Sequence, residues 1–177
     1  MSGTSTIAAG TSPYGVCISA DGASVYSVSS NIVSIFTRNT STGALSGTST
    51  IATGTGPQAI CISADGASVY AANTGSATVS IFTRNTSTGA LSGTSTIATG
   101  TTPQGVCISA DGASVYVANN SSNTVSIFTR NTSTGALTAA GTIATGTSPQ
   151  EICISADGAS VYAVNQTSNT VSIFTRS

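Results

Sequence analysis

The chain has 177 residues, of which 39% are hydrophobic and 5% are charged, and its formal net charge is −1. The apolar content is too high for intrinsic disorder, and without a basic cluster to neutralise phosphates we expect no nucleic-acid partner. No stretch approaches the ~20 apolar residues of a membrane span, so we expect no membrane partner. Residues 1–4 do not resemble a secretory signal, and the sequence indicates no compartment.

One unit of about 46 residues occurs four times, in approximately residues 2–45, 46–91, 92–137 and 138–177. The register is clearest from the cysteines, which stand 44, 46 and 46 residues apart at Cys17, Cys61, Cys107 and Cys153. The first unit lacks two residues just before Ile32. A period of this length is typical of repeat architectures, so we treat residues 1–177 as one domain built from repeats.

The third unit predicts four short strands in chain order. An apolar run over residues 105–109 ends at Asp111-Gly112, which is a strong hairpin signal. A second strand over residues 113–119 and a third over 124–130 are rich in β-branched residues. A turn over residues 131–135 leads to a fourth strand within 136–145, and no segment has helical periodicity.

Four strands every 40–50 residues predict an all-β propeller of four-stranded antiparallel blades, four in each chain, with a stacked β-solenoid as the less favoured alternative. Residues 2–12 match the fourth strand of the other units, so we expect this N-terminal strand to complete a C-terminal blade. The side chains between blades are small, which suits the narrow wedges of an eight-bladed ring. We therefore expect a homodimer, with a compact four-bladed monomer as the alternative.

The segment from Ser109 to Asn119 reads SADGASVYVAN and is followed by Thr124-Val125-Ser126. These residues resemble the signature of propellers in the Tyr-Val-Thr-Asn repeat and lactonase-like group. The resemblance covers nearly the whole chain and implies the propeller fold. The near-identity of the units implies recent amplification or deliberate construction, and the sequence does not separate the two.

Enzymes of the lactonase-like group rely on His, Glu and Arg residues around the channel mouth. This chain has no His, and Glu151 is its only Glu. We therefore expect a protein that is not an enzyme and has no catalytic residues.

We also expect no cofactor and no metal. Each Asp-Gly pair lacks a second carboxylate nearby, which fits hairpin turns better than calcium ligation. The spacing of the cysteines excludes zinc motifs of the C-x₂-C type, and we expect four free, largely buried thiols.

The loops before the first strand and between the second and third strands lie on one face of an up-and-down blade. This placement predicts a polar, uncharged rim around the channel mouth, formed by Tyr14, Gln58, Gln104, Gln150, Asn73, Asn119 and Asn165. The function we expect is a non-catalytic propeller scaffold that binds a small ligand or peptide at this face. The alternatives are a lactonase-like enzyme and a cell-surface adhesion or carbohydrate-binding module.

The opposite face is expected to carry charge. Asp111 ends the first strand of its unit and Arg130 ends the third, and these strands run in the same direction. Two strand spacings amount to about 9.6 Å, which an extended Arg side chain can span. We therefore predict Asp–Arg pairs within each unit, arranged as an alternating ring.

Overall fold

The computed structural model describes residues 5–176. Its strands form four antiparallel sheets, each in sequential order. The first sheet contains β1 (Pro13–Ile18), β2 (Ser24–Ser29), β3 (Ile32–Arg38) and β4 (Leu45–Ala52). The second contains β5 (Pro57–Ile62), β6 (Ser68–Asn73), β7 (Thr78–Arg84) and β8 (Leu91–Ala98). The third contains β9 (Pro103–Ile108), β10 (Ser114–Asn119), β11 (Thr124–Arg130) and β12 (Leu137–Ala144). The last, in the described residues, has three strands, β13 (Pro149–Ile154), β14 (Ser160–Asn165) and β15 (Thr170–Thr175).

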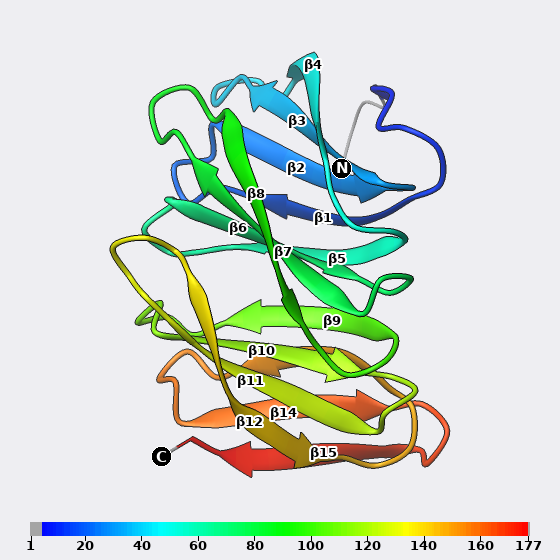
Figure 1. Cartoon of the computed structure of the whole chain (residues 1–177). Helices are drawn as coiled ribbons and strands as arrows, with labels where there is room; N and C mark the ends of the chain where they lie inside the picture. The colour runs from blue at the N-terminus through cyan, green and yellow to red at the C-terminus, as the bar shows by residue number, and fades with distance from the viewer. Residues whose placement is uncertain (1–4, 177) are drawn as a thin grey trace.

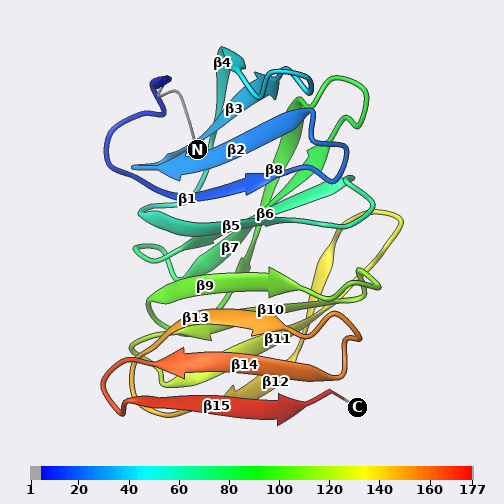
Figure 2. The ribbon, with the colours of Figure 1, turned by 180° about the vertical axis from the view of Figure 1, so that it is seen from behind.

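The sheets stack in chain order along an arc, from the first sheet beside the N-terminus to the last sheet beside the C-terminus (Figure 1). Neighbouring sheets pack through their first strands, β1 against β5, β5 against β9 and β9 against β13. The view from behind shows these four strands following one another along the stack (Figure 2). The prediction of an all-β propeller with four-stranded antiparallel sheets is confirmed, and the strands of the third unit begin and end within two residues of their predicted bounds.

The hydrophobic core consists of three clusters, and each cluster joins two neighbouring sheets. In the first, Tyr26 and Val33 of the first sheet pack with Ile60 and Phe82 of the second. The other two clusters repeat this arrangement between the second and third sheets and between the third and last. Each sheet therefore buries apolar side chains against its neighbours, as expected for repeat proteins.

The Asp-Gly turns form as predicted. Gly112 has a φ of 68°, which favours glycine, and its amide donates to the carbonyl of Ser109 at 2.8 Å. Asp111 accepts hydrogen bonds through one carboxylate oxygen from the Ser109 hydroxyl and the Ala113 amide. The second carboxylate oxygen stays free to reach a neighbouring sheet.

The predicted N-terminal strand is not formed over the described residues. Residues 5–12 contain no strand, and residues 2–4 lie outside the described part of the chain. The Ser30 hydroxyl donates to the carbonyl of Thr11 at 3.0 Å, so the segment approaches the first sheet. A strand requires a hydrogen-bonded neighbour. The open edge at β15 lies at the other end of the arc (Figure 1).

Candidate functional site

The first strands of the four sheets line the inner side of the arc, and small residues let them approach closely. At Gly105, an added Cβ would lie 2.8 Å from the carbonyl oxygen of Gln150 on the next sheet. A larger side chain there would push β9 and β13 apart. At this level of the inner wall the backbones of neighbouring first strands lie close together, so larger side chains stand out from it.

One of these larger side chains is Glu151 on β13. The equivalent positions of the other units are Gly15, Ala59 and Gly105, so Glu151 is the only carboxylate at this level of the inner wall. Its side chain is exposed. Sequence reasoning set it aside because His was missing. The signal that could have found it is this single departure from Gly or Ala in otherwise near-identical units.

A cavity of about 310 Å³ opens at this position. It is lined by Glu151 together with Tyr14 and Gln58, which are two of the predicted ligand-binding residues, and by small and apolar residues of β1, β5 and β9. This volume is at the lower end of the ~300–1,000 Å³ found for small-molecule sites. The cavity thus combines one carboxylate with a phenol and an amide, which are able to bind a ligand of monosaccharide size.

Three other predicted residues do not line this cavity. Gln150 and Asn165 line a shallower hollow of about 430 Å³ on the uncovered end of the last sheet. Gln104 is half-buried on β9. The structure therefore brings Tyr14 and Gln58 together with Glu151, and it separates Gln150 from them. Ligand binding by these residues stays a prediction.

The three Asn residues at the ends of the second strands are buried rather than part of an exposed rim. Asn73 donates through its side-chain nitrogen to the Ser80 hydroxyl at 2.9 Å and to the Thr78 hydroxyl at 3.1 Å. Asn119 and Asn165 make the equivalent contacts. This corrects the expected rim, since these amides hold the adjacent hairpin and are not presented to solvent.

The opposite face carries the predicted charges. Arg130 is buried; its Nε donates to the hydroxyl of Tyr70 at 2.7 Å, and its Nη1 donates to the carbonyl of Gly112 at 3.2 Å. Its Nη2 donates to Asp65 Oδ2 at 2.9 Å and to Ser68 Oγ at 3.0 Å. Of these five residues, Arg130 and Gly112 belong to the third sheet and the other three to the second. One guanidinium therefore fastens two sheets together.

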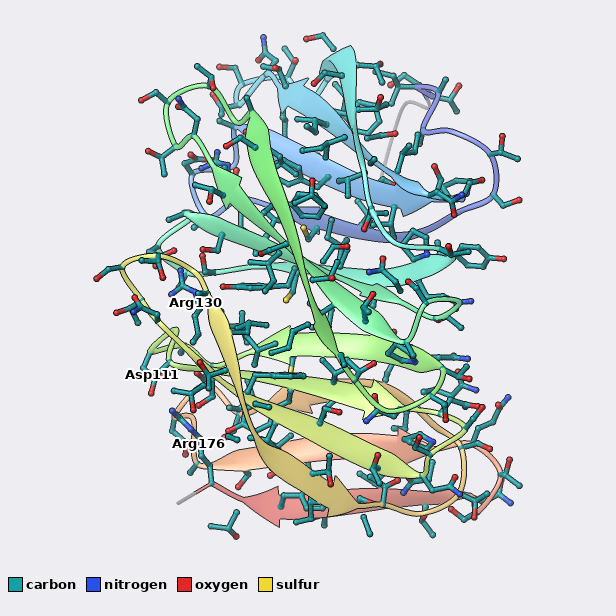
Figure 3. All side chains as sticks on the ribbon, viewed as in Figure 1. Asp111, Arg130 and Arg176 are labelled. Atoms are coloured by element: carbon teal, nitrogen blue, oxygen red, sulfur yellow. The ribbon has the colours of Figure 1, made fainter. Side chains whose placement is uncertain are left out.

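The same contact joins the other neighbouring sheets. Arg84 lies 3.2 Å from Asp21, and Arg176 lies 2.7 Å from Asp111. Figure 3 shows Arg130, Asp111 and Arg176 along one side of the stack. The predicted shared face is confirmed, but pairing within a unit is wrong. Arg84 and Arg130 each bond the Gly carbonyl of their own turn. Together with Arg176, they reach the Asp of the preceding sheet instead of their own.

Burial and hydrogen bonding shift the pKa values of several groups. The hydrogen bond from Ser109, with that from the Ala113 amide, lowers the pKa of Asp111 to about 2. Desolvation raises the pKa of Cys17 and Cys107 to about 12. These shifts keep the Asp ionised and the two thiols protonated at neutral pH.

The cysteines of the described residues are free, as predicted, but they are not all buried. Cys17, Cys61 and Cys107 are half-buried between sheets, whereas Cys153 is exposed. The reason is that the side of a sheet that carries its Cys is covered by the next sheet, and the last sheet has none after it. Within residues 5–176, no group of three or more His, Cys, Asp or Glu side chains is placed to hold a metal ion. Among the same residues, no helix of the length and apolarity needed to cross a bilayer occurs.

Comparison with known proteins identifies the family. The lactonase family of seven-bladed β-propellers matches residues 2–108 and 95–177. The chain belongs to this family. No curated protein matches the chain.

Solved structures of other lactonase-like propellers are similar to this one. A protein from Bacteroides uniformis, assigned as a 6-phosphogluconolactonase, superposes with a TM-score of 0.85 at 22% identity over 93% of this chain and 50% of that one. The periplasmic gluconolactonase of Pseudomonas aeruginosa gives a TM-score of 0.81 at 22% identity over 93% and 50%. The present chain spans about half the length of these proteins. At this identity the likeness establishes the fold.

The family match overturns the expectation of a protein that is not an enzyme, because membership in a lactonase family points to a hydrolytic enzyme. The error came from treating His as indispensable. A carboxylate can also serve as a general base, and the inner wall carries one at Glu151.

Proposed function

We propose that this lactonase-family chain hydrolyses a small lactone in the inner cavity, with Glu151 as the general base. The observation that carries the proposal is the position of Glu151, the only Glu of the chain, on a cavity of about 310 Å³. Family membership supports the reaction class. The gluconolactonase names of two structural relatives suggest a sugar-acid lactone as the substrate class.

Hydrolysis of a lactone requires an activated water and a stabilised oxyanion. In the proposed reaction the Glu151 carboxylate removes a proton from water, and the water oxygen attacks the lactone carbonyl. The bond between the carbonyl carbon and the ring oxygen then breaks, and the proton passes from Glu151 to that ring oxygen, giving a hydroxy acid. Tyr14 and Gln58 line the same cavity and are the donors available to the oxyanion or to substrate hydroxyls.

The charge of the cavity favours an unphosphorylated lactone. The chain has four Arg or Lys residues, and all four are Arg at the ends of third strands, Arg38, Arg84, Arg130 and Arg176. These ends lie on the face opposite the start of the first strands, where Tyr14 and Glu151 are found. A phosphate group would therefore meet the negative charge of Glu151 without a neighbouring cation.

Hydrolysis of glucono-δ-lactone, followed in a pH-stat above the uncatalysed rate, tests the proposal. Glu151→Gln should lower kcat by about 100-fold or more, as general-base removal does. Asp157→Asn is the matched control, because it removes a carboxylate of the same sheet on the opposite face. Compared at a concentration where this variant and the unaltered chain have the same mass in solution, it should leave kcat unchanged. A rate equal to background for the unaltered chain, or equal rates for Glu151→Gln and the unaltered chain, would overturn the proposal.

The 6-phosphate of the same lactone tests the charge argument separately. We expect a lower kcat/KM for the phosphorylated substrate at low ionic strength. Preference for the phosphorylated lactone would refute the argument from charge and leave the role of Glu151 to the first experiment.

A further inference from the structure

The last sheet exposes apolar residues that the inner sheets bury. Val171 on β15 is 52% exposed, whereas the equivalent Val79 and Val125 are 0% and 1% exposed. Val164 on β14 is also exposed. In the inner sheets these positions pack against the following sheet. The outward side of the last sheet thus exposes the apolar surface that, in the inner sheets, packs against the following sheet.

The first sheet exposes the complementary surface. Val16 on β1 is 68% exposed, whereas the equivalent Ile60, Val106 and Ile152 are 7%, 8% and 5% exposed. Those three residues pack against the preceding sheet. The outward side of the first sheet therefore exposes the apolar surface that, in the other sheets, packs against the preceding sheet.

The charges at the two ends complement each other. At each of the three inner interfaces the Arg of the later sheet pairs with the Asp of the earlier one. In the described part of the chain, Arg38 of the first sheet and Asp157 of the last form no ion pair. These are the Arg and the Asp that one further interface of the same kind would join.

A hydrogen bond between uncharged groups also links each of the first two sheets to the next one. The hydroxyl of Tyr26 donates to the carbonyl of Gly89 on the next sheet at 2.7 Å, and that of Tyr70 donates to Gly135 at 2.7 Å. Tyr116 on the third sheet makes no such bond within the described residues. At a further interface of the same kind, the equivalent bond would join Tyr162 on the last sheet to Gly43 after the first sheet's third strand. Apolar surface, charge and hydrogen-bonding groups therefore all match between the last sheet of one copy and the first sheet of another.

We propose that a second copy of this chain covers both ends, so that two chains close into one ring of eight sheets. Each junction then pairs Arg38 with the Asp157 of the other copy and buries Val16 against Val171. Residues 5–8 of each copy lie beside the open β15 edge of the other, where β4 lies beside β3 within a chain. The two junctions are equivalent, and each joins the last sheet of one copy to the first sheet of the other, in accordance with two-fold closure.

The geometry requires two adjustments. Glu151 stands at the position that Gly15 and Gly105 occupy at inner interfaces, so its side chain has to turn out of the junction toward the inner wall. Seven blades turn by about 51° each and eight by about 45°, so each interface closes by about 6° relative to a seven-bladed ring. The change is spread over several interfaces, whose buried side chains include Ala, Val and Ser as well as Tyr, Phe and Ile. A closed ring also avoids the open sheet edge at β15.

Cys153 reports on the junction without any enzymatic assay. Its equivalents Cys17, Cys61 and Cys107 are half-buried against the next sheet, whereas Cys153 is exposed in the single chain. In the ring the first sheet of the other copy covers Cys153. Its reaction with a thiol reagent should therefore be fast in dilute single chains and at least about tenfold slower in the assembled ring.

Light scattering at micromolar concentration is the first test, and a mass near twice the 17.2 kDa of one chain is expected. Asp157→Arg places two like charges at each junction and should weaken association about 100-fold or more, giving single chains with a reactive Cys153. Arg38→Asp should act in the same way. The double variant should recover the mass of two chains and the protection of Cys153, and circular dichroism checks that each variant keeps its sheets.

A mass of one chain for the unaltered protein overturns the proposal, and so does a mass above two chains, which indicates an open filament. Single charge variants that still form dimers overturn the assigned junction. These readouts do not involve lactone hydrolysis, so this proposal and the proposed function fail or succeed separately.

Discussion

Replacing Arg130 by Met tests whether the guanidinium holds the second and third sheets together. Arg130 donates to four groups, the hydroxyls of Tyr70 and Ser68, the carbonyl of Gly112 and the carboxylate of Asp65. Methionine has an unbranched apolar side chain that can follow the path of the aliphatic part of Arg130. The substitution therefore removes the hydrogen bonds and leaves most of the packing in place.

The magnitude follows from these four contacts. The three buried bonds to uncharged acceptors contribute about 1 kcal/mol each. The ion pair contributes about 0–1 kcal/mol, because the Asp65 side chain is 43% exposed and its charge is screened. We therefore expect Arg130→Met to lower the free energy of unfolding by about 3–4 kcal/mol.

Arg176→Met is the matched control. Arg176 donates to Asp111 at 2.7 Å and to Ser114 at 3.3 Å, and its side chain is 23% exposed. Its loss should cost about 1 kcal/mol. With a urea m-value of about 2 kcal/mol/M, the midpoints should fall by about 1.5–2 M for Arg130→Met and about 0.5 M for Arg176→Met. Equal shifts for the two variants would refute the role assigned to the buried guanidinium.

Three further predictions concern ionisable groups. Hydrogen bonds from neighbouring serine hydroxyls lower the pKa of Asp21 and Asp111 to about 2. A carboxyl group whose pKa is lowered by folding stabilises the fold above about pH 4, and this stabilisation is lost as the pH falls toward 2. The Tm should therefore drop across this window, and a flat Tm would contradict the prediction. Desolvation raises the pKa of Cys107 to about 12, so with Ellman's reagent at pH 8 it should react about a thousandfold more slowly than free cysteine until the chain is unfolded. Tyr70→Phe removes buried hydrogen bonds and should cost about 1–3 kcal/mol in urea unfolding of the single chain. Tyr162→Phe should cost less than 0.5 kcal/mol under the same conditions, and equal losses would show that these bonds contribute nothing.

Most of the fold could be predicted from local sequence. Asp111-Gly112 fixes a hairpin because glycine accepts the positive φ that the turn requires, and the β-branched run from Thr124 to Arg130 forms β11 with the predicted bounds. These features depend on neighbouring residues, which a single sequence displays directly. The four-fold repetition also made the stacking of the sheets predictable.

The candidate site was harder to predict because it depends on contacts between units. Nothing in the order of residues shows that Arg130 bonds to Asp65 rather than to Asp111, since each carboxylate lies in the turn after the first strand of its unit. The burial of Asn73 depends on the Ser80 hydroxyl facing it across the hairpin. Glu151 was visible as a substitution, but its place on the cavity depends on how closely the first strands approach.

The link from each Arg to the sheet before it bears on how the number of units can change over time. A duplication that inserts one more unit brings one Arg and one Asp, and both find partners at the two new boundaries. The ends of the array stay chemically the same, with one Arg at the front and one Asp at the back. Recombination between near-identical copies can therefore lengthen or shorten the gene by whole units without leaving a mismatched charge inside the protein, so the charge pairing does not fix the number of units.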